Sequence, residues 1–294
     1  MPEPRPGLRP RRESPVVEAL ERERAELAEL NVAGRWQEAA DRSASLEQRA
    51  TPEVVRVLLE AALANRMLSG GHYNTAEQQL TAARALAAGR DSELEVLAMV
   101  GLGDLYRSAA KKNQEFHPEL GRAGKLQAAR ALEEQTQQVL SNVAEGSLAR
   151  VKANCEFGLL DVEEGKVDDA LVDYQAATAV AEALLVDQPD SVIARSQLCR
   201  THTLTGEAHD KLNDADSAFT HHERAFKGYE QIRDKRGMAL GQQGMALALE
   251  KKGDPAGAIL CWQTVERIAN SGQEVDSYMA TKAEQALARL TVAS

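Results

Sequence analysis

The chain has 294 residues and a formal net charge of −10 at pH 7, with 43% hydrophobic but only 4% aromatic residues. An acidic chain with few aromatic rings argues against nucleic-acid binding, which uses a basic surface or stacking side chains. The abundance of Ala and Leu favours packed helices over sheets. No apolar run reaches the roughly 18 residues that predict a membrane-spanning helix, so we expect no membrane insertion.

Residues 1–15 form a leader segment with few apolar side chains that a core could bury. They contain five Pro and four Arg, and this composition predicts disorder. A Pro- and Arg-rich tail can also dock a partner that has an acidic or Pro-binding surface. We favour a solvated leader and keep docking as the alternative.

Helical segments are predicted one after another from residue 16. The first is expected over residues 16–30, and its partner over residues 39–46. Thr51 and Pro52 are residue types that cap and open a helix, so the next helix is predicted to run from there to Met67. A double glycine then ends it, and further helices are expected over residues 74–88 and 92–110.

Residues 111–123 interrupt this spacing and are predicted to be a loop inserted in the third hairpin. Phe116 and Leu120 are apolar side chains in an otherwise polar segment. Inserts in repeat proteins gather on one face, often the binding face, whereas a longer surface loop by itself is tolerated at little cost. Both interpretations stay open. A long helix is expected over residues 125–144.

The stretch G-K-V-D-D-A-L-V-D-Y-Q-A-A at residues 165–177 shows the repeated unit most clearly. Its glycine closes one helix, and small or aromatic residues follow on one face of the next helix. Those residues are Val167, Ala170, Tyr174 and Ala177. The same turn, followed by an alanine five residues later, recurs along the chain. The alanines are Ala39, Ala76, Ala129, Ala170, Ala218 and Ala258, and Gly124 and Asn213 are among the predicted turn residues.

These units resemble the tetratricopeptide repeat (TPR), which has a small residue in its first helix, a turn glycine, and then alternating Ala and aromatic positions. The resemblance implies an all-α fold, a right-handed α-solenoid of about six TPR-like hairpins over residues 16–271. Residues 274–294 are expected to form a C-terminal capping helix and tail. Its apolar stripe would be Val275, Met279, Ala283, Ala286, Leu287 and Leu290.

Four histidines gather in the fifth hairpin, namely His202, His209, His221 and His222, with Cys199 one turn from the first of them. Zinc sites use three or four such ligands. We expect instead that His202 and His222 replace aromatic rings in the seam between the helices, at positions where the two rings could face each other. No nucleophile motif is present, and residues 121–126 lack the Ser or Thr of a phosphate loop. We therefore predict no catalytic residues, no metal site and no cofactor.

The first helix of each hairpin faces a concave groove in TPR proteins, so the resemblance implies a set of partner-binding residues. They are Leu58 and Asn65 in the second hairpin, Leu97, Asp104 and Arg107 in the third, Lys152 and Leu159 in the fourth, and Arg200, Thr203 and Glu207 in the fifth. Lys152 and Arg200 are candidate anchors for an anionic group. For Leu58 and Leu97, packing against the next helix is an equal alternative.

The three cysteines, Cys155, Cys199 and Cys261, lie far apart without a C-x-x-C motif. We interpret them as buried free thiols in a reducing compartment and predict a cytoplasmic protein.

The sequence thus predicts a non-catalytic adaptor or scaffold for protein–protein interaction. It would hold an extended peptide or amphipathic helix of a protein partner in its groove. The alternative is a regulatory or sensor subunit of a larger signalling or assembly complex, which makes its contact through residues 111–123 or the leader. Self-association through the N-terminal hairpin also stays open.

Overall fold

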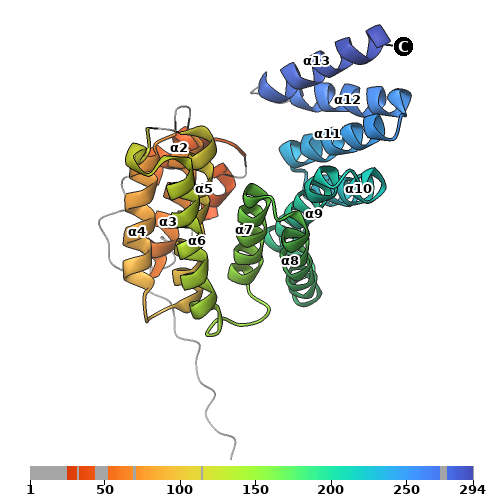
Figure 1. Ribbon diagram of the computed structural model, residues 1–294. Helices are drawn as coiled ribbons and strands as arrows, with labels where there is room; N and C mark the ends of the chain where they lie inside the picture. Colours follow the sequence, from red (N-terminus) through yellow and green to blue (C-terminus); the bar gives the residue numbers. More distant parts are fainter. Residues whose placement is uncertain are drawn as a thin grey trace, which may run out of the picture. The chain divides into compact units, whose positions relative to one another are not determined.

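The computed structural model describes residues 25–31, 33–43, 52–68, 71–113, 115–271 and 277–293, and the regular structure within these ranges is helical throughout (Figure 1). This confirms the predicted all-α solenoid of TPR-like hairpins. The predicted leader over residues 1–15, together with Thr51 and Val275, lies outside the described residues. The contacts group the chain into two compact units, one ending at Ala87 and one beginning at Ala88. The domain boundaries inferred from sequence stay predictions.

The first unit contains helical residues 25–31 and helices α2 (Trp36–Ser43), α3 (Pro52–Met67) and α4 (Tyr73–Ala87). Gly34 makes the first turn with a φ of 75°, a left-handed conformation that glycine adopts without a steric penalty. The core of this unit joins three of its helices through fully buried apolar side chains, and α3 packs along α4. The core residues are Leu27, Ala39, Val57 and Ala64.

The second unit stacks four hairpins and a final helix. The hairpins are α5 (Ser92–Lys112) with α6 (Gly121–Leu140), α7 (Leu148–Glu164) with α8 (Val167–Asp187), α9 (Val192–Lys211) with α10 (Ala215–Gln231), and α11 (Lys235–Lys251) with α12 (Pro255–Ala269). Helix α13 (Ser277–Ala293) packs on α12. The first helices contact one another, α5 with α7, α7 with α9 and α9 with α11, whereas no comparable contact joins α8 to α10 or α10 to α12. The stack therefore curves with α5, α7, α9 and α11 on its inner face.

Side-chain caps mark where six helices of the second unit begin, namely α5, α7, α9, α10, α11 and α12. An Asp or Ser before a helix accepts a hydrogen bond from the backbone N–H three residues later, an interaction that contributes about 1 kcal/mol. These caps are Asp91, Ser147, Ser191, Asp214, Asp234 and Asp254. Gly165 and Gly253 close the preceding helices in the left-handed conformation, with φ of 82° and 75°. The turns predicted at these two glycines are confirmed.

The segment predicted to be a loop over residues 111–123 is shorter in the structure. Helix α5 continues to Lys112, and α6 begins at Gly121, so Gly124 lies inside a helix and the turn predicted there is wrong. The glycine with a positive φ is Gly121, at 58°. The turn glycine is therefore three residues earlier than the repeat spacing predicts. As a result, the helix predicted over residues 125–144 spans residues 121–140 instead.

Two buried side chains hold this loop against the hairpin. Phe116 is only 2% exposed, and its ring lies 5.4 Å from that of Tyr106 in α5. Lys125 is buried in α6, and its Nζ donates a hydrogen bond of 2.9 Å to the carbonyl of Asn113 at the end of α5. Phe116 therefore serves packing, and of the two apolar residues noted in this segment only Leu120 reaches solvent.

Glycines let the helices of the second unit approach closely around buried rings. A Cβ on Gly158 of α7 would lie 2.5 Å from the ring of Tyr174 in α8, so only glycine fits there. His222 of α10 is held in the same way by Gly206 of α9 and Gly244 of α11, where an added Cβ would lie 2.7 Å and 2.3 Å from its imidazole. A histidine thus occupies the seam position that an aromatic ring fills one hairpin earlier, as predicted for His222.

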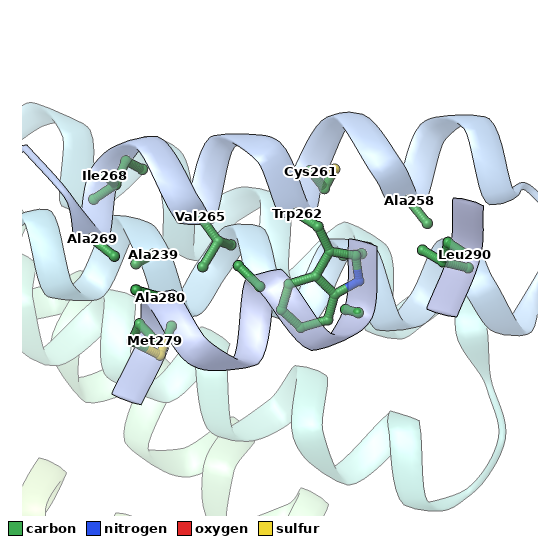
Figure 2. Close-up of a cluster of buried hydrophobic side chains, with 13 residues drawn as sticks. Ala239, Ala258, Cys261, Trp262, Val265, Ile268, Ala269, Met279, Ala280 and Leu290 are labelled. Atoms are coloured by element: carbon green, nitrogen blue, oxygen red, sulfur yellow. The ribbon is translucent and has the colours of Figure 1, made fainter. Parts of the chain in front are cut away.

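The open end of the stack is closed by an apolar cluster shared by α11, α12 and α13 (Figure 2). Trp262 of α12 is buried within it, and its indole Nε1 donates a hydrogen bond of 2.8 Å to Glu250. Helix α13 contributes to this cluster those residues of its predicted apolar stripe that lie within the described part of the chain. They are Met279, Ala283, Ala286 and Leu290, which are buried, and Leu287, which is partly buried. The final helix therefore covers the last hairpin as a cap.

Candidate functional site

The inner face of the second unit, formed by α5, α7, α9 and α11, brings together most of the predicted partner-binding residues. Eight of them lie on its first three helices. These are Leu97, Asp104 and Arg107 on α5, Lys152 and Leu159 on α7, and Arg200, Thr203 and Glu207 on α9. Leu58 and Asn65 lie on α3, in the first unit.

The two predicted residues of the first unit are engaged in packing. Leu58 is 5% exposed. Asn65 is buried, and its Nδ2 donates hydrogen bonds to the carbonyl of Ala61 at 3.0 Å and to Oε1 of Gln79 in α4 at 3.1 Å. Leu58 is therefore packed within the first unit and Asn65 links α3 to α4. The predicted role of both residues in binding stays a prediction.

A buried ion-pair network joins α5 to α7 at the start of the inner face. The guanidinium of Arg107 donates to Glu156 Oε1 at 2.6 Å and to Asp104 Oδ1 at 2.5 Å. Burial raises the pKa of Glu156 to about 7, against the opposing effect of Arg107. A cavity of about 10 Å³ beside Gly103 and Glu156 has room for no more than one water molecule. Arg107 is thus held by internal partners.

A second set of ion pairs extends this network toward the ends of the same helices. Glu163 of α7 pairs with Lys111 of α5 and lies 3.6 Å from Arg122 of α6. On the side away from the inner face, Arg130 of α6 donates to Asp161 of α7 at 2.6 Å. The third and fourth hairpins are therefore joined by charged side chains that satisfy one another, in addition to a buried apolar cluster that α5, α6 and α7 share.

The predicted residues of α9 differ from one another in their surroundings. Thr203 is 7% exposed, and its hydroxyl donates to the carbonyl of Cys199 at 3.1 Å. Arg200 is half-buried and Glu207 is exposed. Neither of these two side chains has a hydrogen-bond or ion-pair partner among the described residues. Arg200 lies in the field of Asp104 and Glu156. Although part of the Glu207 side chain reaches solvent, desolvation of its carboxylate by the surrounding protein raises the pKa of Glu207.

Two leucines of α11 continue this surface and were missed in the sequence. Leu240 and Leu247 are each 36% exposed, a large value for leucine in a packed hairpin. They follow Arg200 and Glu207 by 40 residues, which is the spacing between Ala218 and Ala258. Carrying the groove positions one repeat further along the sequence would have found them.

The histidines of the fifth hairpin form a compact cluster with a different pairing from the one that the repeat alignment allowed. His202 faces His221, with their Nδ1 atoms 3.4 Å apart, whereas His222 points to Asp210 at 3.2 Å. The facing of His202 and His222 that the repeat alignment allowed is therefore replaced by these two pairings. The cause is the rotation of α10, which places neighbouring side chains on different faces of the helix.

Burial and nearby positive charge favour the neutral form of His202 and His221. The pKa of His202 and that of His221 are both lowered to about 4, mainly by burial, with Arg224 adding to the effect. His209 stacks on His221 with ring centroids 5.6 Å apart. Within the described residues, no group of three or more His, Cys, Asp or Glu side chains is arranged to hold a metal ion.

The three cysteines are buried free thiols in α7, α9 and α12, as predicted. Burial raises the pKa of Cys155 to about 11 and that of Cys199 to about 12. These thiols are therefore poor nucleophiles at neutral pH. No helix in the described part of the chain combines the length and the apolar character needed to cross a bilayer.

Solved structures share this architecture over most of the chain. BtubC from P. vanneervenii is 18% identical, with a TM-score of 0.57 over 85% of this chain and 91% of its own. The apo form of RapI is 11% identical, with a TM-score of 0.60 over 94% of this chain and 71% of its own. Aspartyl phosphate phosphatase F from Bacillus subtilis is 11% identical, with a TM-score of 0.51 over 97% of this chain and 71% of its own.

These similarities show a fold, that of the TPR-type helical repeat proteins. At such low identity they show nothing about activity or partners. No protein-family model matches the sequence, and the search of curated proteins found no match.

Proposed function

We propose that this α-solenoid of TPR-like hairpins is a non-catalytic adaptor that binds a segment of a partner protein on its inner face. The observation that carries the proposal is the surface of α9 and α11. There, Arg200 and Glu207 have no internal partner among the described residues, and Leu240 and Leu247 remain exposed. Charged and apolar groups left open on a curved helical surface are the features by which such surfaces bind peptides and helices.

The chemistry of the remaining polar groups supports binding over catalysis. Carboxylates with a raised pKa are frequent in active sites, and Glu156 and Glu133 both have a pKa of about 7. Each of them, however, is paired to an arginine within the fold, Arg107 and Arg130 respectively. These pairs fit a structural role in joining hairpins. One of the similar structures is named a phosphatase, but at 11% identity that likeness concerns the fold.

The three buried thiols, of which Cys155 and Cys199 have a strongly raised pKa, are compatible with the reducing cytoplasm that we propose as the site of action. The loop of residues 113–120 is a weaker candidate contact, because Phe116 is packed inside the hairpin. The inner face therefore takes precedence over the loop as the proposed binding surface.

The test is cross-linking mass spectrometry on the tagged protein in lysate from its source. The wild type is compared with Leu240→Asp, and the matched control is Val172→Asp on α8, where the side chain is 65% exposed. We expect one partner to cross-link to α9 and α11, to be lost with Leu240→Asp and to be retained with Val172→Asp. A partner that both variants retain, with cross-links to the loop of residues 113–120, would transfer the binding role to that loop.

A further inference from the structure

Four side chains on two adjacent helices form a regular pattern on the inner face. Arg200 and Glu207 are seven residues apart on α9, and Leu240 and Leu247 are seven residues apart on α11. The two helices contact each other. As the first helices of successive hairpins, they run in the same general direction. A seven-residue step covers about 10 Å along a helix and returns to nearly the same face. The surface therefore presents two charges of opposite sign beside two leucines, each pair about 10 Å apart.

The two charges stand out because the neighbouring charges are neutralised within the fold. Arg107 is paired to Glu156 and Asp104. Asp210 accepts hydrogen bonds from Lys251 at 3.1 Å and from His222 at 3.2 Å. Arg200 and Glu207 lie between these two networks with no hydrogen-bond or ion-pair partner among the described residues. Being seven residues apart on one helix, they are too distant to pair with each other.

We infer that this surface, α9 with α11, binds an amphipathic helix that carries an acidic and a basic side chain seven residues apart, with an apolar stripe beside them. The acidic group would pair with Arg200 and the basic group with Glu207, while the stripe would cover Leu240 and Leu247. This inference rests on the proposed function and adds the chemistry of the partner segment.

A helix fits this pattern where an extended strand does not. Residues on one face of a strand repeat about every 7 Å, so strand positions fall near 7 and 14 Å and miss the spacing of about 10 Å. A bound helix repeats the same step every seven residues and can therefore meet both charges and both leucines at once. Grooves between parallel helices accept a third helix by this kind of packing.

The experiment is a selection from displayed peptides of about 18 residues, roughly five helical turns. The peptides have a fixed apolar stripe, and two positions seven residues apart vary among Glu, Lys and Ala. The selection is run on the full chain as the wild type, Arg200→Glu and Glu207→Arg. Circular dichroism and a thermal melt first show that each variant folds as the wild type does.

We expect the wild type to enrich peptides with one Glu and one Lys, Arg200→Glu to enrich Lys at both positions, and Glu207→Arg to enrich Glu at both. This readout does not depend on the direction in which the peptide lies. A peptide selected on the wild type should bind either variant at least about tenfold more weakly, because a like charge then faces it.

Two other outcomes would overturn the inference in distinguishable ways. Enrichment that ignores the two variable positions, but is lost with Leu240→Asp, would show a groove that binds helices without the charge pairing inferred here. If no peptide is enriched on the wild type, the inference fails; if the lysate experiment also finds no partner on α9 and α11, the proposed function fails with it.

Discussion

The two halves of the inner face use charge in opposite ways. Between α5 and α7, Arg107, Asp104 and Glu156 satisfy one another in a buried network. Between α9 and α11, Arg200 and Glu207 have no such partners among the described residues, and the neighbouring leucines are partly exposed. Charged side chains of the first helices therefore serve cohesion in one half and leave surface open in the other. Residue type alone does not distinguish the two, because both halves contain arginine and glutamate.

Removing one member of the buried network should have the largest effect. We expect Glu156→Ala to lower the free energy of unfolding by about 3 kcal/mol, because Arg107 would remain buried with only one of its two carboxylate partners. Urea denaturation followed by circular dichroism measures the change. The matched control is Glu207→Ala on α9, where loss of an exposed carboxylate should change stability by less than about 0.5 kcal/mol. An equal loss of unfolding free energy in the two variants would contradict the proposed difference between the two halves of the inner face.

The close approach of α11 to His222 is the next most sensitive feature. Gly244→Ala should destabilise the protein by about 2 kcal/mol, because the new Cβ would lie 2.3 Å from the imidazole of His222. Gly146→Ala is the control, since an added Cβ there meets nothing within 4 Å. Thermal melts of the two variants make the comparison. A melt of Gly244→Ala that matches the wild type would show that His222 can leave the seam at no cost.

The histidine cluster should make the half containing α9 and α10 sensitive to acid. The pKa of His202 and of His221 is lowered to about 4 in the folded protein, so between pH 6.5 and 4 the unfolded chain binds more protons. Stability is therefore complete above pH 6.5 and falls as the pH drops toward 4. We expect a loss of about 1 to 2 kcal/mol at pH 5, reduced from the full linkage value because the two rings interact and His221 is partly solvated.

The control for this pH effect is the double variant His202→Gln with His221→Gln, measured by urea denaturation at pH 7.5 and at pH 5. The difference between wild type and variant isolates the two imidazoles from His209, His222, Arg224 and the carboxylates nearby. Identical pH profiles for the two proteins would mean that these rings do not titrate as their burial implies.

The smallest effect is expected where the inner face is open. Arg200→Ser and Leu240→Ser should each change the free energy of unfolding by less than about 0.5 kcal/mol, because neither side chain is fixed by an internal polar partner or fully buried. Chemical denaturation of both variants tests this. A loss above about 1 kcal/mol in either would assign that residue to the fold and remove it from the proposed binding surface.

Much of the fold could be predicted from the sequence because the repeat pattern is local. Gly165 and Gly253 mark turns, and the alanines that follow them pack at the seams, as the spacing indicated. Spacing failed at Gly124, because the insertion between α5 and α6 places the turn at Gly121. A period found elsewhere in the chain cannot locate a turn inside an insertion, because the insertion changes the register.

The candidate site was predicted less completely. Arg107 and Arg200 both fell on the predicted stripe, but one is tied into a buried network and the other is open. The difference arises from Glu156, which lies far from Arg107 in the sequence and reaches it only across α5 and α7. Thr203 also fell on the stripe, yet the turn of α9 directs its hydroxyl back to Cys199.

The sequence by itself determined that this protein is a stack of helical hairpins, because turn glycines, capping residues and seam alanines act within one hairpin and leave a periodic trace. Only the tertiary structure decided which charges of the inner face are satisfied and which remain open. That outcome depends on distances between side chains of different hairpins, set by how α5, α7, α9 and α11 pack against one another. The sequence pattern gives the position of each charged residue along the chain, but it does not identify the partner that neutralises that charge.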